Sequence, residues 1–141
     1  MSEPIKLSYH VPGDDFTRAG EASSAVKKTL KKLGVHPDVV RRVAIAMYEG
    51  EINMVIHAHG GEIEVEIHPD IVKMELRDTG PGIEDISLAM QEGYSTAPDE
   101  VRNLGFGAGM GLPNMKKYTD DMRIESELGV GTTVWMTVKN E

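Results

Sequence analysis

The stretch from Val72 to Gly82 constrains the fold of this chain more than any other feature. Apolar side chains alternate with charged ones from Val72 to Arg77, which predicts a strand with one buried face. Asp78 continues the apolar side of this alternation, so we expect its carboxylate to point toward the core, where it needs a hydrogen-bond donor. Gly80 and Gly82 follow and let the backbone approach a flat ligand. We predict that Asp78 accepts a ligand amino group, although the pattern alone also fits a polar turn after an edge strand.

Length and composition favour one globular domain spanning residues 1–141, with 40% hydrophobic and 27% charged residues. A net charge of -8 argues against direct binding to nucleic acid or to an anionic membrane, because phosphate backbones attract basic surfaces. A single bound nucleotide is not excluded. The absence of cysteine excludes disulfides and thiol catalysis. No signal-like start and no membrane-spanning apolar run are present, so we expect a cytoplasmic protein.

The N-terminal part predicts a strand followed by a helix. Residues 5–11 alternate in polarity, and Asp14 or Asp15 is placed to cap a helix whose apolar positions run from Phe16 to Leu33. Arg18 lies in the first turn of that predicted helix, where a cation gains nothing from the helix dipole. Either chance or a contact with a partner explains it.

A second helix is predicted from Pro37 to about Ala58, with apolar residues around nearly its whole circumference, so we expect it to be buried between layers. Glu49, Asn53 and His57 interrupt the apolar surface at intervals of four residues and form one polar stripe. A carboxylate and a carboxamide aligned in this way favour a functional site over isolated core polar groups.

The two residues that follow Glu49 are expected to have different surroundings, a close packing contact at Gly50 and solvent at Glu51. Gly50 costs the helix about 1 kcal/mol relative to alanine, which the close approach of another group would explain. Glu51 falls on a different face from the polar stripe, and we expect it to be exposed.

The remaining segments predict two strand pairs separated by a loop region. Residues 62–67 and 72–78 form a hairpin, a short helix follows at 83–91, and residues 92–106 have the composition of a functional loop or lid. Two further strands alternate at 122–126 and 132–138, with Thr132 on the inward face like Asp78.

A glycine-rich segment, residues 105–112, leads into another helix. Glycines before a helix N-terminus favour phosphate binding, because free amides and the helix dipole point at the anion. The segment is not a Walker loop, since no Gly-Lys-Ser/Thr follows, and no strand directly precedes it as in the dinucleotide fingerprint.

These motifs occur together and in a specific order: Glu49-x-x-x-Asn53, Asp78-x-Gly80-x-Gly82, a lid, Gly107-x-Gly109-x-Gly111 and Gly131-Thr132-Thr133. Over nearly its whole length the chain resembles the GHKL (Bergerat-fold) ATPase family of gyrase, Hsp90, histidine kinases and MutL, and within it the bacterial serine kinases that regulate sigma factors. The resemblance implies the α/β (α+β) histidine kinase-like ATPase fold. This fold is a two-layer sandwich with helices on one face of a mixed, mostly antiparallel sheet.

The resemblance also implies roles for individual residues. Asp78 would accept the adenine amino group with support from Thr132, Asn53 would ligate Mg²⁺, and Glu49 would act as the general base in phosphoryl transfer. His57 matches a histidine frequent in these kinases, and we favour a supporting or packing role for it. The remaining residues expected to contact ATP are Gly80, Gly82, Ser95, Thr96, Gly107, Ala108, Gly109, Met110, Gly111 and Leu112.

Partner recognition is implied by Phe16 and Arg18, which match a partner-contacting stretch of the anti-sigma kinases. Ala108 departs from those kinases, and the glycine-rich segment looks closer to the switch kinases of stress signalling, so direct binding of a sigma factor stays open. The first hypothesis is a Mg²⁺-ATP-dependent serine/threonine kinase acting on a STAS-type anti-sigma antagonist. The alternative is a nucleotide-gated binding module, an anti-sigma factor or a phosphatase activator, with little or no transfer. A homodimer is a further expectation from the family.

Overall fold

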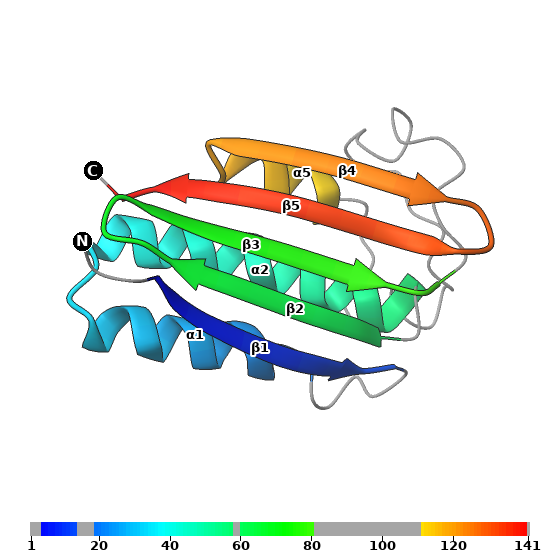
Figure 1. Cartoon of the computed structure of the whole chain (residues 1–141), viewed down its shortest axis with the longest axis horizontal. Coiled ribbons are helices and arrows are strands. Elements are labelled where there is room, and N and C mark those ends of the chain that lie inside the picture. The colour runs from blue at the N-terminus through cyan, green and yellow to red at the C-terminus, as the bar shows by residue number, and fades with distance from the viewer. Residues whose placement is uncertain (1–3, 14–18, 58–59, 81–110, 141) are drawn as a thin grey trace.

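The structure is a computed structural model that describes residues 4–13, 19–57, 60–80 and 111–140. In this part of the chain, helices cover one face of a single sheet and form the second of two layers (Figure 1). The elements are β1 (Ile5–Pro12), α1 (Glu21–Lys32), α2 (Pro37–His57), β2 (Gly60–Ile67), β3 (Ile71–Asp78), α5 (Gly111–Lys117), β4 (Asp121–Glu127) and β5 (Gly131–Lys139). The predicted short helix at 83–91 and the loop at 92–106 lie outside the described residues.

The sheet has the strand order β1-β2-β3-β5-β4, and each of these neighbouring pairs is antiparallel. The predicted hairpin of β2 and β3 is confirmed, with Ile63 opposite Leu76. β3 also pairs directly with β5, which follows it only after residues 79–130. The expected fold, helices on one face of a mostly antiparallel sheet, is confirmed, and the described pairings include no parallel one.

Helix α2 is the centre of the core. It contacts α1 on one side, α5 on the other, and strands β1, β2, β3 and β5. Val43, Ala46 and Met47 are completely buried, which confirms the prediction of a helix enclosed between neighbours. From the sheet, Val72, Met74 and Leu76 of β3 are at most 3% exposed, so the predicted alternation is also confirmed.

Helix α1 begins later than the sequence pattern predicts. Ala19 and Gly20 form a turn, Gly20 has φ = +100°, and the helix starts at Glu21. The left-handed backbone of Gly20 is not helical, so the helix cannot extend toward the N-terminus beyond this residue. The N-cap position is therefore Gly20, and neither Asp14 nor Asp15 caps α1. Both aspartates, with Phe16 and Arg18, lie outside the described residues.

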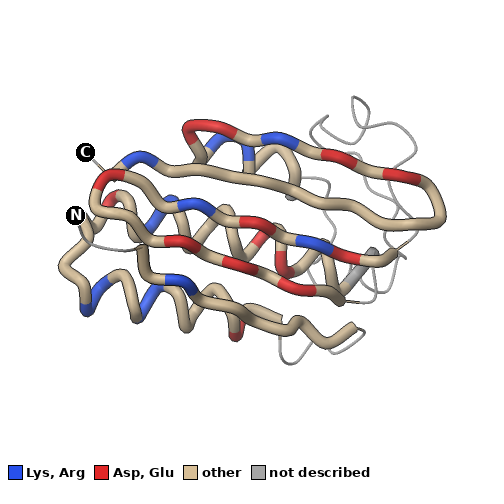
Figure 2. The backbone as a smooth tube through the Cα atoms, viewed as in Figure 1, with Lys and Arg blue, Asp and Glu red and all other residues tan. Residues whose placement is uncertain are grey.

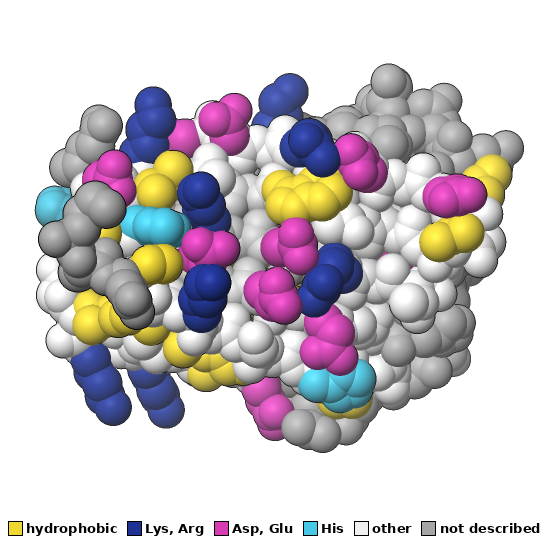
Figure 3. All heavy atoms as spheres, viewed as in Figure 1, with side chains coloured by type: hydrophobic (Ala, Val, Ile, Leu, Met, Phe, Trp, Pro, Cys, Tyr) yellow, Lys and Arg dark blue, Asp and Glu magenta, His cyan; other side chains and the backbone are white. Residues whose placement is uncertain are grey.

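Acidic and basic residues lie close together along the strands (Figure 2), and the face of the sheet opposite the helices shows their side chains interleaved (Figure 3). Arg77 forms ion pairs with Glu64 at 3.1 Å and Glu75 at 3.2 Å. Trp135 donates from Nε1 to Glu75 Oε1 at 2.6 Å, and Arg123 lies over its ring at 4.4 Å. This charged face extends from β2 across β3, β5 and β4.

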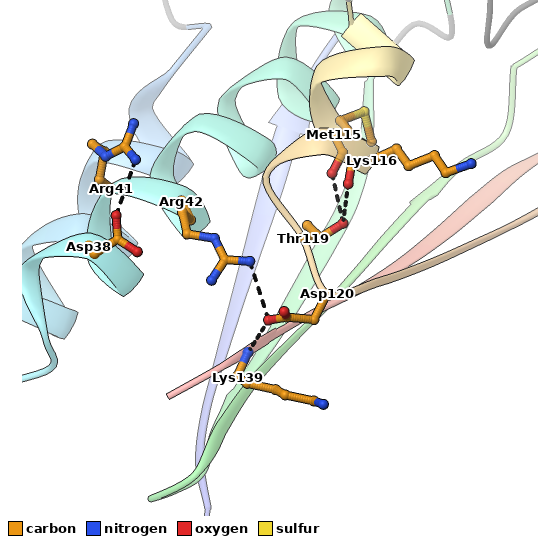
Figure 4. Close-up of polar contacts among 8 residues, drawn as sticks. All are labelled: Asp38, Arg41, Arg42, Met115, Lys116, Thr119, Asp120 and Lys139. Carbon is orange, nitrogen blue, oxygen red and sulfur yellow. Dashed lines mark hydrogen bonds and ion pairs between the residues drawn. The ribbon is translucent and has the colours of Figure 1, made fainter. Parts of the chain in front are cut away.

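Asp120, between α5 and β4, joins three parts of the fold at the end of the molecule where α2 begins (Figure 4). Its Oδ2 accepts a hydrogen bond from the backbone amide of Lys139 at 2.7 Å and lies 3.4 Å from Arg42 Nη2. The pKa of Asp120 is held below its ordinary value, chiefly by the Lys139 amide and, with smaller effect, by the charge of Arg42. None of the described helices is long and apolar enough to cross a membrane.

Candidate functional site

Asp78 ends β3 and continues the side of the strand that carries Val72, Met74 and Leu76, as predicted, although its side chain is half-buried rather than enclosed. Its Oδ1 accepts hydrogen bonds from the backbone amides of Gly80 at 3.0 Å and Thr132 at 3.1 Å. Among the described residues none donates to Oδ2, so this oxygen is available to a ligand. Burial raises the pKa of Asp78, and the two amide bonds partly oppose this.

Thr132 places β5 against Asp78. It is buried, as predicted, and its hydroxyl lies 2.8 Å from the Ser126 hydroxyl on β4. Gly131 precedes it with φ = +149°, and a Cβ built there would lie 2.1 Å from the carbonyl oxygen of Asp78. Only glycine allows the two strands to approach this closely, so residue 131 helps to determine where the Thr132 amide meets the carboxylate.

Glu49 and Asn53 of the predicted stripe both contact α5. Glu49 is half-buried, and its Oε1 accepts a long hydrogen bond of 3.5 Å from Asn114 Nδ2. Asn53 Nδ2 lies 3.9 Å from the sulfur of Met115, while its Oδ1 has no donor among the described residues. The predicted alignment of these two side chains is therefore present. His57 is the last residue of α2, and its side chain lies outside the described part of the structure.

Because Gly50 has no side chain, the part of α2 that carries Glu49 and Asn53 can pack closely against the sheet. A Cβ at this position would lie 2.3 Å from Leu76 Cδ2 and 3.2 Å from Met115 Cε. Close approach was the predicted reason for a glycine inside this helix, and the partners are β3 and α5. The turn of α2 that carries Glu49 therefore packs within two residues of Asp78 along β3.

Glu51 contradicts the prediction that it is exposed. It is 2% exposed, and its two oxygens accept hydrogen bonds from the backbone amides of Gly20 at 2.9 Å, Ala22 at 3.1 Å and Ser23 at 3.0 Å. The periodicity of α2 shows on which face of the helix Glu51 lies, but it does not show which element packs on that face. In the structure, the start of α1 covers it. One signal was available: Gly20, before α1, has no side chain to cap it.

The other predicted residues divide into two groups. Gly80 is buried and donates to Asp78, Gly111 begins α5, and Leu112 packs against the hydrophobic core. The rest lie outside the described residues: Gly82, Ser95, Thr96, Gly107, Ala108, Gly109, Met110, Phe16 and Arg18.

Comparison with known proteins identifies the family. Residues 38–141 match the family described as histidine kinase-, DNA gyrase B- and HSP90-like ATPases. The chain belongs to this ATPase family. The match includes β3, β5 and all of α2 after Pro37, the elements that carry the four side chains Glu49, Asn53, Asp78 and Thr132.

Curated relatives of this ATPase include several named anti-sigma F factor. The protein from Clostridium botulinum (strain Eklund 17B / Type B) is 35% identical over 124 residues, which cover 84% of this chain and 83% of that protein. Those from Geobacillus stearothermophilus and Priestia megaterium are 31% and 30% identical, and each match covers 94% of this chain and 88% of the relative. The resemblance inferred from the sequence motifs, including its sigma-factor-regulating branch, is confirmed.

An ATPase of this family binds ATP, and the described side chains fit that ligand. Asp78 Oδ2, to which none of the described residues donates, lies at the end of β3 and is the kind of acceptor that an exocyclic amino group requires. Asn53 offers a carboxamide oxygen. Mg²⁺ prefers oxygen ligands and takes few from the protein when phosphates and waters supply the others, so one such oxygen is a sufficient protein contribution.

Proposed function

We propose that this chain is a Mg²⁺-ATP-dependent protein serine/threonine kinase that regulates a sigma factor or a stress-signalling partner switch by phosphorylating a STAS-type anti-sigma antagonist. The observation that carries the proposal is the pairing of Glu49 with Asn53 one turn apart on α2, packed through Gly50 against the strand that ends at Asp78. Phosphoryl transfer requires a general base, a metal ligand and a group that fixes the nucleotide. Glu49, Asn53 and Asp78 are suited to these three tasks. The anti-sigma F factor relatives support the regulatory context.

In the proposed mechanism each described residue has one task. Asp78 accepts the adenine amino group through Oδ2, while the Thr132 amide holds Oδ1. The Asn53 oxygen would hold Mg²⁺, which would supply charge neutralisation at the phosphates. Glu49 takes the proton from the attacking hydroxyl of the protein substrate, and Asn114 orients the Glu49 carboxylate from α5.

Further residues, most of them outside the described part, complete the proposal. Gly107, Ala108, Gly109 and Met110, with Gly111 and Leu112, are proposed to bind the phosphates, Gly80 and Gly82 to line the base, and Ser95 and Thr96 to contact the γ-phosphate. Phe16 and Arg18 are proposed to contact the partner protein. We further propose that the protein acts in the cytoplasm and forms a homodimer there.

A second candidate function is a nucleotide-gated binding module that holds a sigma factor, or activates a phosphatase, with little or no transfer. The name anti-sigma factor, which the relatives carry, describes binding of a regulator rather than catalysis. The intact Glu49 favours the kinase, because a binding module needs no general base.

Labelled ATP separates the two functions. The full chain is incubated with [γ-³²P]ATP, Mg²⁺ and a candidate antagonist recovered by pull-down in the presence of ATP or ADP. A kinase transfers label to the antagonist, and omission of Mg²⁺ abolishes the transfer. A tight complex without label in the partner would overturn the kinase proposal and leave the binding module.

A further inference from the structure

Ser126 of β4 lies directly opposite Thr132 of β5, so the two side chains share one face of the sheet. This is the face that the helices cover, because Met122 and Ile124, on the same side of β4 as Ser126, pack against the hydrophobic core. In the sheet β5 lies between β4 and β3 (Figure 1). Ser126 therefore stands beside Thr132 on the side away from Asp78.

The hydroxyls of Ser126 and Thr132 form a short hydrogen bond, with 2.8 Å between the two oxygens. Ser126 Oγ also lies 3.3 Å from the carbonyl oxygen of Gly131, to which it can donate. Hydroxyl hydrogen bonds usually measure about 2.5 to 3.0 Å, so the bond between the two hydroxyls is the stronger of the two. Thr132 is only 8% exposed, and its hydroxyl therefore depends on partners other than bulk water.

Each hydroxyl has one proton and can also accept, so the bond between them can run in either direction. When Thr132 donates to Ser126, and Ser126 to Gly131, the Thr132 hydroxyl can only accept from a ligand. When Ser126 donates to Thr132, the Thr132 proton can go to a ligand acceptor, and only the long bond of 3.3 Å is given up. Ser126 thus provides a partner for Thr132 in both directions and lets the Thr132 proton turn toward a ligand.

The Thr132 hydroxyl lies next to a carboxylate that can accept. The backbone amide of Thr132 donates to Asp78 Oδ1 at 3.1 Å, and none of the described residues donates to Oδ2. The site can therefore present an acceptor from Asp78 beside a donor from Thr132. Adenine has the complementary pair, an amino group that donates next to ring nitrogens that accept, whereas guanine has a carbonyl in place of this amino group.

We propose that Ser126 is a positioning residue for recognition of the nucleotide base. By donating to Thr132, its hydroxyl directs the Thr132 proton to a ring nitrogen of adenine beside the amino group that Asp78 accepts. This inference rests on the proposed assignment of Asp78 and Thr132 to the base, and it is independent of phosphate transfer. It adds a residue of β4, which belongs to none of the sequence motifs, to the determinants of nucleotide specificity.

The test combines two variants of the full chain with analogues of ADP, which carries the adenine base and is not consumed by transfer. Ser126→Ala removes the hydroxyl. Thr133→Val is the matched control, because Thr133 follows Thr132 on β5 and its side chain points to the opposite face of the sheet. Adenine has two ring nitrogens beside its amino group, N1 and N7, so the two analogues are those in which a carbon replaces N1 or N7. Calorimetry in the presence of Mg²⁺ gives the Kd for ADP and for each analogue.

We expect Ser126→Ala to weaken ADP binding by about threefold to tenfold, the scale of one neutral hydrogen bond. For one of the two analogues the variant and the wild type should bind within about twofold of each other, because that analogue has no nitrogen to accept the Thr132 proton. Thr133→Val should bind all three nucleotides like the wild type.

Unchanged ADP affinity in Ser126→Ala would overturn the inference. An equal loss of affinity for ADP and for both analogues would also overturn it, since this is the result of a purely structural role. A wild-type chain that binds ADP but transfers no label to an antagonist would refute the proposed kinase and leave this inference standing.

Discussion

At the scale of single residues, Asp78 combines two properties that generally oppose each other. Its side chain is half-buried, which disfavours the ionised form, and two backbone amides favour that form. Because both amides bond to Oδ1, the carboxylate is held in place, and within the described part of the chain no group donates to Oδ2, so a ligand can donate to it. A fixed acceptor of this kind loses little entropy on binding.

Asp78→Asn should weaken ATP binding while leaving the fold intact. The carboxamide oxygen can still accept from Gly80 and Thr132, but its amino group would face the ligand amino group, donor against donor. We expect ATP affinity to fall roughly 10- to 100-fold, with a Tm at pH 7 no lower than wild type because a desolvated charge is removed. Calorimetric titration and thermal unfolding measure the two. Unchanged affinity would exclude Asp78 as the base-binding residue.

The raised pKa of Asp78 makes a further prediction about pH. In the free protein this carboxyl takes up a proton at a higher pH than an ordinary aspartate, whose pKa is 3.8. ATP affinity should therefore be constant at neutral pH and fall as pH drops through the raised pKa. In Asp78→Asn this part of the pH dependence should disappear. An identical pH profile in both proteins would mean that another group controls it.

Glu49→Ala is expected to bind ATP with a Kd within about twofold of wild type but to transfer no detectable phosphate, since a general base contributes typically 10²- to 10⁴-fold to the rate. Binding is followed by calorimetry and transfer with labelled ATP. Glu75→Ala is a suitable control, because this glutamate lies on the opposite face of the sheet. Wild-type transfer rates in Glu49→Ala would refute its role as base.

At the scale of elements, the site depends on how closely α2 packs on β3. Gly50→Ala should cost about 1 to 3 kcal/mol of unfolding free energy through overpacking against Leu76, which is buried and cannot move aside freely. The gain of about 1 kcal/mol in helix propensity offsets part of this loss. Urea unfolding of the variant measures the net effect.

A double-mutant cycle identifies the cause. In a Leu76→Ala background the space beside residue 50 is open, so Gly50→Ala should be neutral or stabilising there. An equal loss in both backgrounds would show that the contact with Leu76 is not what excludes a side chain.

Element patterns in the sequence predict part of this arrangement and miss the rest for a physical reason. Alternation identified β3 and β5 and the inward direction of Asp78 and Thr132, because the period of a strand is local. The start of α1 and the burial of Glu51 depend on contacts between helices about 30 residues apart. No local period encodes such contacts, although the glycine before α1 was a hint that its cap comes from elsewhere.

At the scale of the whole molecule, Asp120 connects the first turns of α2 to the end of β5. Its pKa is lowered in the folded state, so its stabilising effect is complete above the unfolded value near 3.8 and is lost as pH falls through the folded pKa. Asp120→Ala should lower Tm by about 2 to 5 °C at pH 7, a modest effect because the group is largely exposed.

The difference between wild type and Asp120→Ala should shrink on acidification below pH 3.8. Asp121→Ala is the matched control, since this neighbouring aspartate is exposed, and its Tm should follow wild type at both pH values. Thermal unfolding at pH 7 and in acid tests this, and a difference that grows in acid would contradict the assignment.

The direct pairing of β3 with β5 has a consequence for cutting and rejoining the chain. Seven residue pairs, from Ile71 opposite Lys139 to Arg77 opposite Thr133, join β3 to β5. In the sequence, residues 81–110 lie between these two strands. A protease nick in that stretch would leave two fragments that still share a continuous ladder. The N-terminal fragment would carry Glu49, Asn53 and Asp78 and the C-terminal fragment Thr132, so ATP binding would report the reassembly of the two fragments as a split protein.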